Sequence, residues 1–479
     1  MTMNSEIKTQ FYKFLKIQDN LSAEFYGSGE ITYENSQKYS CNFGALQLTN
    51  GDTYFAIDSP RPGTHSLKEI DRKFNFHGIT DSGLIAIINQ KDVQFLNHGT
   101  IVPYVQIYLI RRFKIERVSK KPIKKIKFGL TNFLFTGDSF RNTLLLNLCD
   151  LPAISIKRLP DYDTIKNQLE NKSSIAVTSE LEIPVDNSQN IKEILNISFE
   201  ICHLLSICRG TKVFWIYYRC YDEFGNIVFQ TYCDMTTRSL SELPELITSE
   251  SFGLESTKKF LETAYTTVLQ NLLLRRYLQR FSNVFVEARD GKGFLESRGV
   301  RIVVVMEMLA KYVLENPYFE ISAYILNSST CKDTKKAILE SCKSAINAKI
   351  IDSDIKFTDR WNLPNVESME TQNMVIERRE DLINNLSSLN HTPFRRIIVR
   401  LCEKINLEVD EQEIKRFVNS RNALIHTGNF YSDPSVDRAI FEEYSFLVNF
   451  LDRVFLKLFN YSGDYNNFRK WGNSLRDTI

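Results

Sequence analysis

The periodicity of apolar residues changes near residue 235, and this change most limits the folds that the chain can adopt. Before it, apolar and polar residues alternate in short runs such as TYFAID at 53–58, which is typical of half-buried strands. Turn sequences separate these runs, including Asn50-Gly51-Asp52 and Asp81-Ser82-Gly83. After it, apolar residues recur every three or four positions, as in amphipathic helices. The sequence therefore predicts an α+β protein, with strands first and helices second.

The two patterns divide the chain into three predicted segments. Residues 1–235 are expected to form an antiparallel, sandwich-like β-rich domain with one helix that ends at Gly210 and a hairpin that turns at 222–226. Residues 236–257 are rich in Ser, Thr and Glu and are predicted to be a linker. Residues 258–479 are expected to be helical, with candidate helices at 258–281, 298–315, 334–348, 370–386, 393–404, 410–427 and 436–460.

Composition narrows the class of protein. Hydrophobic content of 43% and charged content of 25% are ordinary for a globular chain, and a net charge of +2 provides no global attraction for nucleic acid. The nine cysteines include no CxxC pair, which predicts reduced thiols and neither a disulfide framework nor a metal site. The first residues lack the apolar core of a signal peptide, and no run is apolar enough for a membrane span. We expect a cytoplasmic protein that does not associate with membranes.

The segment at 410–427 is predicted to be a helix with two defined ends. Asp410 is placed to cap its N-terminus, and Glu413 is the reciprocal partner in a capping box. Gly428 follows the last helical position, where glycine commonly ends a helix. The sequence therefore predicts that residues 421–427 form the last turns of this helix.

Three polar side chains in those last turns suit chemistry on RNA. Arg421 falls among apolar positions such as Val418 and Ile425, where a charge needs a carboxylate, a phosphate or water. Arginine can hold a phosphate, and the near-neutral imidazole of His426 can move the proton of a 2′-hydroxyl. Asn422 is four positions from His426, close enough to orient the imidazole or to contact a substrate. The plainer interpretation is an arginine in a buried ion pair and a histidine that caps the helix.

The run RNALIHTG at 421–428 resembles the signature of HEPN domains of the Apea-like branch, which is Arg, Asn, three mostly apolar residues, His, a small residue and often Gly. Upstream, the segment RGVRIVVVMEMLAKYVL carries Glu307 in an apolar run and is similar to the second helix of that family. The later run LFNYSGDY is similar to the Tyr/Gly ending of many such domains. The order of elements in the first half is similar to that of the N-terminal domain of ApeA-type defence proteins.

The resemblance implies an all-α HEPN-like bundle that acts as a metal-independent endoribonuclease and needs no cofactor. Arg421, Asn422 and His426 would be catalytic, and Glu307 would support them by orienting Arg421. The substrate would be RNA, with transfer RNA as a candidate, cleaved by attack of the 2′-hydroxyl on the adjacent phosphate. Two copies would form a homodimer through the helical domain. The implied setting is a toxin of anti-phage defence by abortive infection, restrained by the N-terminal domain until a phage protein triggers it.

A second candidate RNA-binding region lies between residues 111 and 127. An electrostatic track there would consist of Arg111, Arg112, Lys114, Lys120, Lys121, Lys124, Lys125 and Lys127. The plainer interpretation is a solvated hairpin whose edge lysines prevent strand pairing.

The alternative function is a HEPN-like module without catalytic activity that binds RNA, a nucleotide or another protein. Arg421 and His426 would then serve folding or dimerisation. The spacing of these two residues does not decide the matter, because Arg72 and His77 have the same spacing in a run, KFNF, that is typical of a strand. The helical setting of Arg421 is what distinguishes it.

Overall fold

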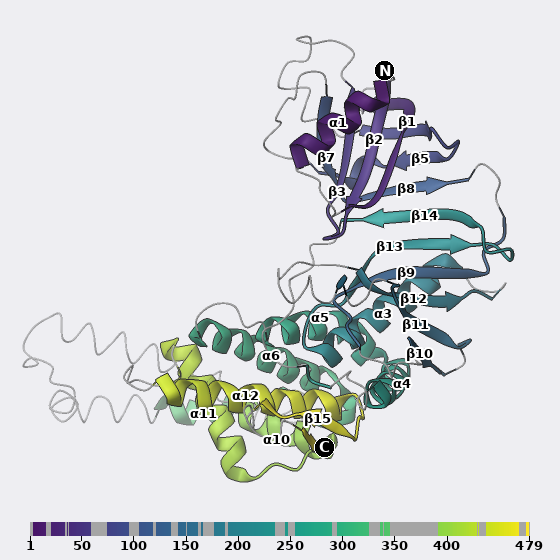
Figure 1. The fold of residues 1–479 in the computed structure, drawn as a ribbon. Helices are drawn as coiled ribbons and strands as arrows, with labels where there is room; N and C mark the ends of the chain where they lie inside the picture. The colour runs from purple at the N-terminus through teal and green to yellow at the C-terminus, as the bar shows by residue number, and fades with distance from the viewer. Residues whose placement is uncertain are drawn as a thin grey trace, which may run out of the picture. The chain divides into compact units, whose positions relative to one another are not determined.

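A computed structural model gives the fold of the chain (Figure 1). It describes residues 3–15, 21–33, 36, 38–58, 74–94, 105–117, 121–135, 142–149, 151–160, 164–165, 177–186, 190–234, 245–247, 254–289, 295–324, 336–338, 340–344, 391–428, 430, 437–468 and 476–478. The chain divides into two compact units, Met1–Val305 with Ala423–Ile479, and Met306–Asn422. The predicted order of strands followed by helices is confirmed, so the protein is of the α+β class.

The strands of the first half form a 14-stranded sheet in the described part of the chain. Its order is β10-β11-β12-β9-β13-β14-β8-β5-β4-β1-β2-β3-β7-β6, and the neighbouring strands run antiparallel. The strands are β1 (Leu21–Tyr33), β2 (Lys38–Leu48), β3 (Thr53–Asp58), β4 (Phe74–Thr80), β5 (Ile85–Ile88), β6 (Val93–Gln94), β7 (Val105–Ile110), β8 (Arg112–Glu116), β9 (Lys125–Thr131), β10 (Thr143–Leu146), β11 (Ile154–Arg158), β12 (Val177–Pro184), β13 (Phe214–Tyr221) and β14 (Ile227–Cys233).

The sheet curls strongly along its N-terminal strands. Phe74 on β4 and Tyr108 on β7 have ring centroids 5.1 Å apart, although β1, β2 and β3 lie between those strands in the hydrogen-bonded order. Four steps of about 4.8 Å in a flat sheet would separate them by about 19 Å. Phe43, Phe55 and Phe76 fill the enclosed core beside them. The sandwich-like arrangement expected from sequence differs in this respect, because one continuous sheet supplies both layers of the core.

Among the residues that the structure describes, α1 (Met3–Leu15) and α3 (Ile191–Arg209) are helices that accompany the sheet. Helix α1, which the sequence analysis did not predict, places Ile7 against Leu46 and Ala56 of the sheet. The predicted helix before Gly210 is confirmed as α3, with a capping box at its start and Gly210 in the left-handed region at its end. The predicted turns at 50–52, 81–83 and 222–226 each connect two paired strands.

The second half is helical, as expected. Its described elements include α4 (Leu254–Gln270), α5 (Leu272–Arg289), α6 (Leu295–Glu315), the 3-10 turn η2 (Pro317–Phe319), α10 (Phe394–Lys404), α11 (Glu411–Thr427), α12 (Asp437–Leu458) and the short hairpin β15 (Asp464–Asn466) and β16 (Arg476–Thr478). In the described part of the chain, no helix is long and apolar enough to cross a membrane.

The boundaries of the predicted helices differ in places. The single helix predicted at 258–281 is two helices, because Asn271 interrupts it and its Oδ1 accepts a hydrogen bond from the amide of Leu274 at 2.9 Å, as an N-cap does. Residues 336–338 and 340–344 of the helix predicted at 334–348 are helical. The helix predicted at 370–386 lies outside the described residues, as does the linker predicted at 236–257 apart from 245–247 and the first residues of α4.

Candidate functional site

Helix α11 carries the motif and has both of the ends that its sequence predicts. The carboxylate of Asp410 accepts a hydrogen bond from the amide of Glu413 at 2.6 Å, which caps the first turn. At the other end, Gly428 adopts a φ of 72° and its amide donates to the carbonyl of Leu424 at 3.1 Å. Only glycine takes that backbone conformation without strain, so the helix stops directly after the turn that holds His426.

The buried face of α11 is rotated from the one that the apolar pattern predicts. Ile414, Phe417 and Leu424 are buried, whereas Ile425 is 45% exposed. Arg421 therefore lies at the edge of the buried face, with 21% of its side chain exposed. A helix turns about 100° per residue, so Leu424 lies almost directly above Phe417 two turns later. Phe417 therefore marks the centre of the buried face.

Arg421 makes three contacts with neighbouring side chains, all within the unit Met306–Asn422. Its Nε donates to Oε1 of Glu307 on α6 at 2.8 Å, and its Nη2 donates to the same oxygen. Its Nη1 donates to Oδ1 of Asn422 at 2.9 Å. The guanidinium also lies over the ring of Phe394, 4.7 Å from the centroid. The pairing of Arg421 with Glu307 that the sequence predicts is thus present.

These contacts leave Arg421 with capacity for a further anion. A guanidinium has five N–H donors, and the described residues take one on each of its three nitrogens. One N–H on each terminal nitrogen remains, and these are the atoms with which arginine holds a phosphate. Glu307 is 47% exposed, so the ion pair fixes the orientation of the guanidinium without enclosing it.

Asn422 and His426 differ in how the structure places them. Asn422 turns its carbonyl oxygen toward Arg421 and orients the arginine. This is neither of the two roles that its spacing suggested, which were to orient the imidazole or to contact a substrate. His426 is exposed in the last turn of α11, and the described residues offer its imidazole no hydrogen-bond partner. Its ring nitrogens are accessible for proton transfer.

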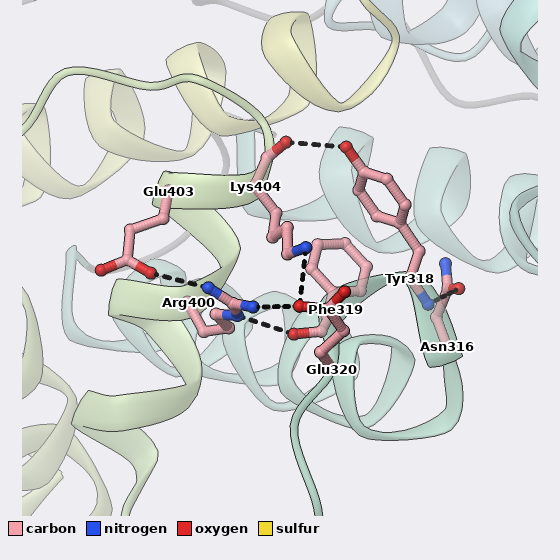
Figure 2. Close-up of polar contacts among 7 residues, drawn as sticks. All are labelled: Asn316, Tyr318, Phe319, Glu320, Arg400, Glu403 and Lys404. Carbon is pink, nitrogen blue, oxygen red and sulfur yellow. Dashed lines mark hydrogen bonds and ion pairs between the residues drawn. The ribbon is translucent and has the colours of Figure 1, made fainter.

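A polar cluster fixes α10 to the end of α6 within the same unit (Figure 2). Arg400 donates from Nε to the carbonyl of Phe319 at 2.7 Å and from Nη2 to Glu320 at 2.6 Å. Lys404 lies 3.0 Å from Glu320, and the hydroxyl of Tyr318 donates to the carbonyl of Lys404 at 3.1 Å. The cations of Lys404 and Arg400 hold the pKa of Glu320 below its usual range. The helices that present Glu307 and Phe394 to Arg421 are thereby held together.

Phe394 is the site residue that the sequence did not reveal. It is the first residue of α10, directly after Pro393, and the sequence marks that position only as a helix start. Its contact with Arg421 joins residues 27 positions apart in the sequence, which no local pattern encodes.

The basic residues predicted as an RNA track are divided between strands. Arg112 and Lys114 lie on β8, whereas Lys125 and Lys127 lie on β9, and β13 and β14 separate the two strands in the sheet. Both strands pair on both sides, so these lysines are not edge lysines and the interpretation as a hairpin with edge lysines is wrong. Lys120 lies outside the described residues.

Acidic residues face several of these lysines. Lys127 lies 3.6 Å from Glu180 and 3.5 Å from Glu182, and Lys114 pairs with Glu116. Burial of Lys127 lowers the pKa of its ammonium, but Glu180, Tyr221 and Glu182 together outweigh burial and raise that pKa above its usual value. Lys127 therefore serves cross-strand pairs between β9 and β12, whereas Lys114 pairs within β8.

The remaining cations of that region have separate environments. Arg111 and Arg112 are exposed at one end of β8, and Lys124 is half-buried just before β9. Lys121 lies 3.4 Å from the buried Asp222 in the turn between β13 and β14. The described members thus form no single continuous basic track.

In the described part of the chain, no group of three or more His, Cys, Asp or Glu side chains is arranged to hold a metal ion. Comparisons with protein-family models, with curated proteins and with solved structures found no match.

Proposed function

We propose that the chain is a HEPN-like, metal-independent endoribonuclease. The observation that carries the proposal is the arrangement on α11, in which Glu307 and Asn422 orient Arg421 one turn before an exposed histidine. One N–H donor on each terminal nitrogen of Arg421 meets no partner among the described residues. Phosphate binding and proton transfer are the two functions that RNA cleavage requires.

The chemistry assigns one function to each side chain. His426 removes the proton of the 2′-hydroxyl, or donates one to the departing 5′-oxygen. Arg421 binds the phosphate and stabilises the charge that develops on its oxygens. Asn422 and Glu307 hold the guanidinium in place. The products are a 2′,3′-cyclic phosphate and a 5′-hydroxyl, and DNA is inert because it lacks the internal nucleophile.

A homodimer supplies the second histidine. One motif provides one imidazole, whereas this cleavage benefits from a base and an acid together. Helix α6 exposes Val300 and Val304, which are 46% and 47% accessible and lie one turn apart, with Glu307 further along the same face. Exposed apolar side chains beside a polar site favour a two-fold contact between copies. In the cell such an enzyme acts as a toxin in anti-phage defence, with transfer RNA as a candidate substrate and a phage protein as its trigger.

The second candidate function is a binding module without catalytic activity. The observation that favours it is the set of contacts that Arg421 makes inside the protein. Glu307 and Asn422 accept hydrogen bonds from its guanidinium and Phe394 covers it, as would be expected of an arginine with a structural role. Its ligand is RNA, a nucleotide or another protein.

Cleavage of total RNA by purified protein, with EDTA present, distinguishes the two. We expect discrete fragments that end in a cyclic phosphate from the wild type, and a loss of at least about 100-fold in the His426→Ala variant. His391→Ala is the matched control, because His391 is also exposed but lies before α10, where its ring packs on Tyr324. Equal cleavage by wild type and His426→Ala would place the activity elsewhere, and retention of uncleaved RNA would favour the binding module.

A further inference from the structure

A groove of about 800 Å³ lies between α10, the connection at 405–410 and the first turn of α11. All of its lining residues belong to the unit Met306–Asn422. Its apolar lining consists of Val399, Cys402, Leu407, Val409 and Ile414. Grooves of this size with an apolar lining are typical binding sites for side chains of a ligand or partner.

The charged side chains that line the groove are almost all negative. Its acidic members are Glu403, Glu408, Asp410, Glu411 and Glu413, and they are accompanied by the single cation Arg395. Arg395 pairs with Glu411 at 2.8 Å, and Arg400 pairs with Glu403 at 3.2 Å, so two of these charges are offset. The groove therefore combines an apolar floor with a negative rim.

Helix stability explains only part of this charge. Asp410, Glu411 and Glu413 lie at the start of α11, where acidic residues complement the helix dipole. Glu403 lies in the last turn of α10 and pairs with Arg400 at 3.2 Å, and Glu408 lies on the connection between the helices. The lining of the groove still carries more acidic than basic side chains.

We propose that this groove binds a cationic amphipathic helix of a partner protein. Such a helix inserts apolar side chains, spaced three and four positions apart, into an apolar groove. Its lysines or arginines meet the acidic rim, which sets both specificity and the rate of encounter. The same acidic rim repels phosphate groups, so the groove is not expected to bind RNA. The partner docks on the two helices that carry Phe394 and Arg421.

Fluorescence anisotropy with a labelled peptide tests the proposal. The probe is a peptide of about 15 residues made of Leu and Lys, with its Leu residues at helical spacing. We expect the full chain to bind it, more weakly as salt increases, and Glu408→Gln with Glu411→Gln to weaken binding about tenfold. These two side chains lie on the exposed rim, and glutamine keeps their size, so circular dichroism should show an unchanged fold.

Two controls separate the groove from general attraction. Glu223→Gln with Glu255→Gln removes the same charge from exposed positions outside the groove, in the β13–β14 turn and on α4, and should leave binding unchanged. A peptide with Ser in place of Leu keeps the cations and should bind at least about tenfold more weakly. Absence of binding by the wild type, equal weakening by both pairs of substitutions, or equal binding of the Ser peptide would each overturn the proposal.

Discussion

Arg421 shows how a single charge near an apolar helix face is accommodated. Its guanidinium is only partly exposed, and removal of such a group from water without a partner is costly. Glu307 provides an opposite charge, Asn422 provides a neutral acceptor and Phe394 covers one face of the guanidinium. The remaining N–H donors face no described partner, which is consistent with the proposed role of the residue in binding a phosphate.

Replacement of Glu307 by Gln tests whether the charge orients Arg421. Glutamine retains an acceptor oxygen but loses the ion pair, and a hydrogen bond to a charged group is worth about 1.5 kcal/mol, or about tenfold. We expect kcat/KM for RNA cleavage to fall about tenfold while the thermal midpoint changes little. Glu315→Gln on the same helix, which removes the charge of a surface pair with Lys311 at 3.8 Å, should leave kcat/KM unchanged. Equal activity of the Glu307→Gln and Glu315→Gln variants would remove Glu307 from the site.

His203 makes stability depend on pH. Burial between α3 and α5, with a smaller effect of Lys212, lowers the pKa of His203 to about 4, and its Nδ1 lies 3.1 Å from Oγ of Ser282. The unfolded chain, with a pKa of about 6.5, binds the proton more tightly. The stability that neutral His203 contributes is therefore complete above about pH 6.5 and is lost as pH falls toward 4, by at most roughly 3 kcal/mol.

Urea unfolding between about pH 4.5 and 7 measures this dependence. His203 should contribute a rise in the free energy of unfolding with pH across that window, and His203→Gln should remove this contribution. His77→Gln is the control, because His77 is exposed on β4 and its replacement should leave the slope as it is. An unchanged slope in His203→Gln would show that another group titrates in this range.

At the level of elements, the position of His426 depends on where α11 stops. Gly428 ends the helix in the left-handed region, and a Cβ at that position would meet no atom within 4 Å. The requirement for glycine is therefore one of backbone conformation and not of space. Two hydrogen bonds hold the last turn, which contains His426. The amide of Gly428 donates to the carbonyl of Leu424, and the hydroxyl of Thr427 donates to the carbonyl of Ala423.

Substitution of Gly428 by Ala should loosen the turn that carries His426. A side chain in the left-handed region costs about 1 kcal/mol, so the free energy of unfolding should fall by about that amount, together with cleavage activity. Gly225→Ala is the matched control, because Gly225 also has a positive φ of 78° and open space but lies in the β13–β14 turn. It should lower stability equally and leave cleavage unchanged. Loss of activity in both variants would mean that stability alone governs it.

On the scale of the whole molecule, one curled sheet and a set of helices account for the two halves of the sequence. The end of helix α5 is tied to α12 in the interior, because the buried Arg289 of α5 pairs with the buried Asp452 of α12. A buried charge pair of this kind fixes which helices meet, because removal of either partner leaves an uncompensated charge. The exposed Val300 and Val304 on α6 remain available for a contact between copies.

Substitution of both valines by Lys tests the proposed homodimer. We expect light scattering to show a dimer for the wild type and a monomer for Val300→Lys with Val304→Lys, and we expect cleavage to be lost with the dimer. Leu272→Lys is the control, since Leu272 is 68% exposed on α5 and its replacement should preserve the dimer. A wild-type monomer that cleaves RNA would refute the need for a second copy.

The sequence by itself determined the class of the fold and the ends of several elements. Period-two alternation and turn residues identified strands, because side chains of a strand face alternate sides. Asp410, Gly428 and Gly210 marked helix ends, because caps and left-handed positions depend on local chemistry. The sequence also proposed the pairing of Arg421 with Glu307, on a family resemblance and not on periodicity.

Only the tertiary structure decided what depends on residues far apart in the chain. It curled the strands into one sheet, because ring contacts such as Phe74 with Tyr108 join strands that are not neighbours. It placed Phe394 on Arg421 and rotated the buried face of α11, because neighbouring helices and not propensity choose which side is covered. It also dispersed the basic residues of 111–127 over β8, β9 and the residues beside them, since strand order is set by long-range pairing that local sequence does not encode.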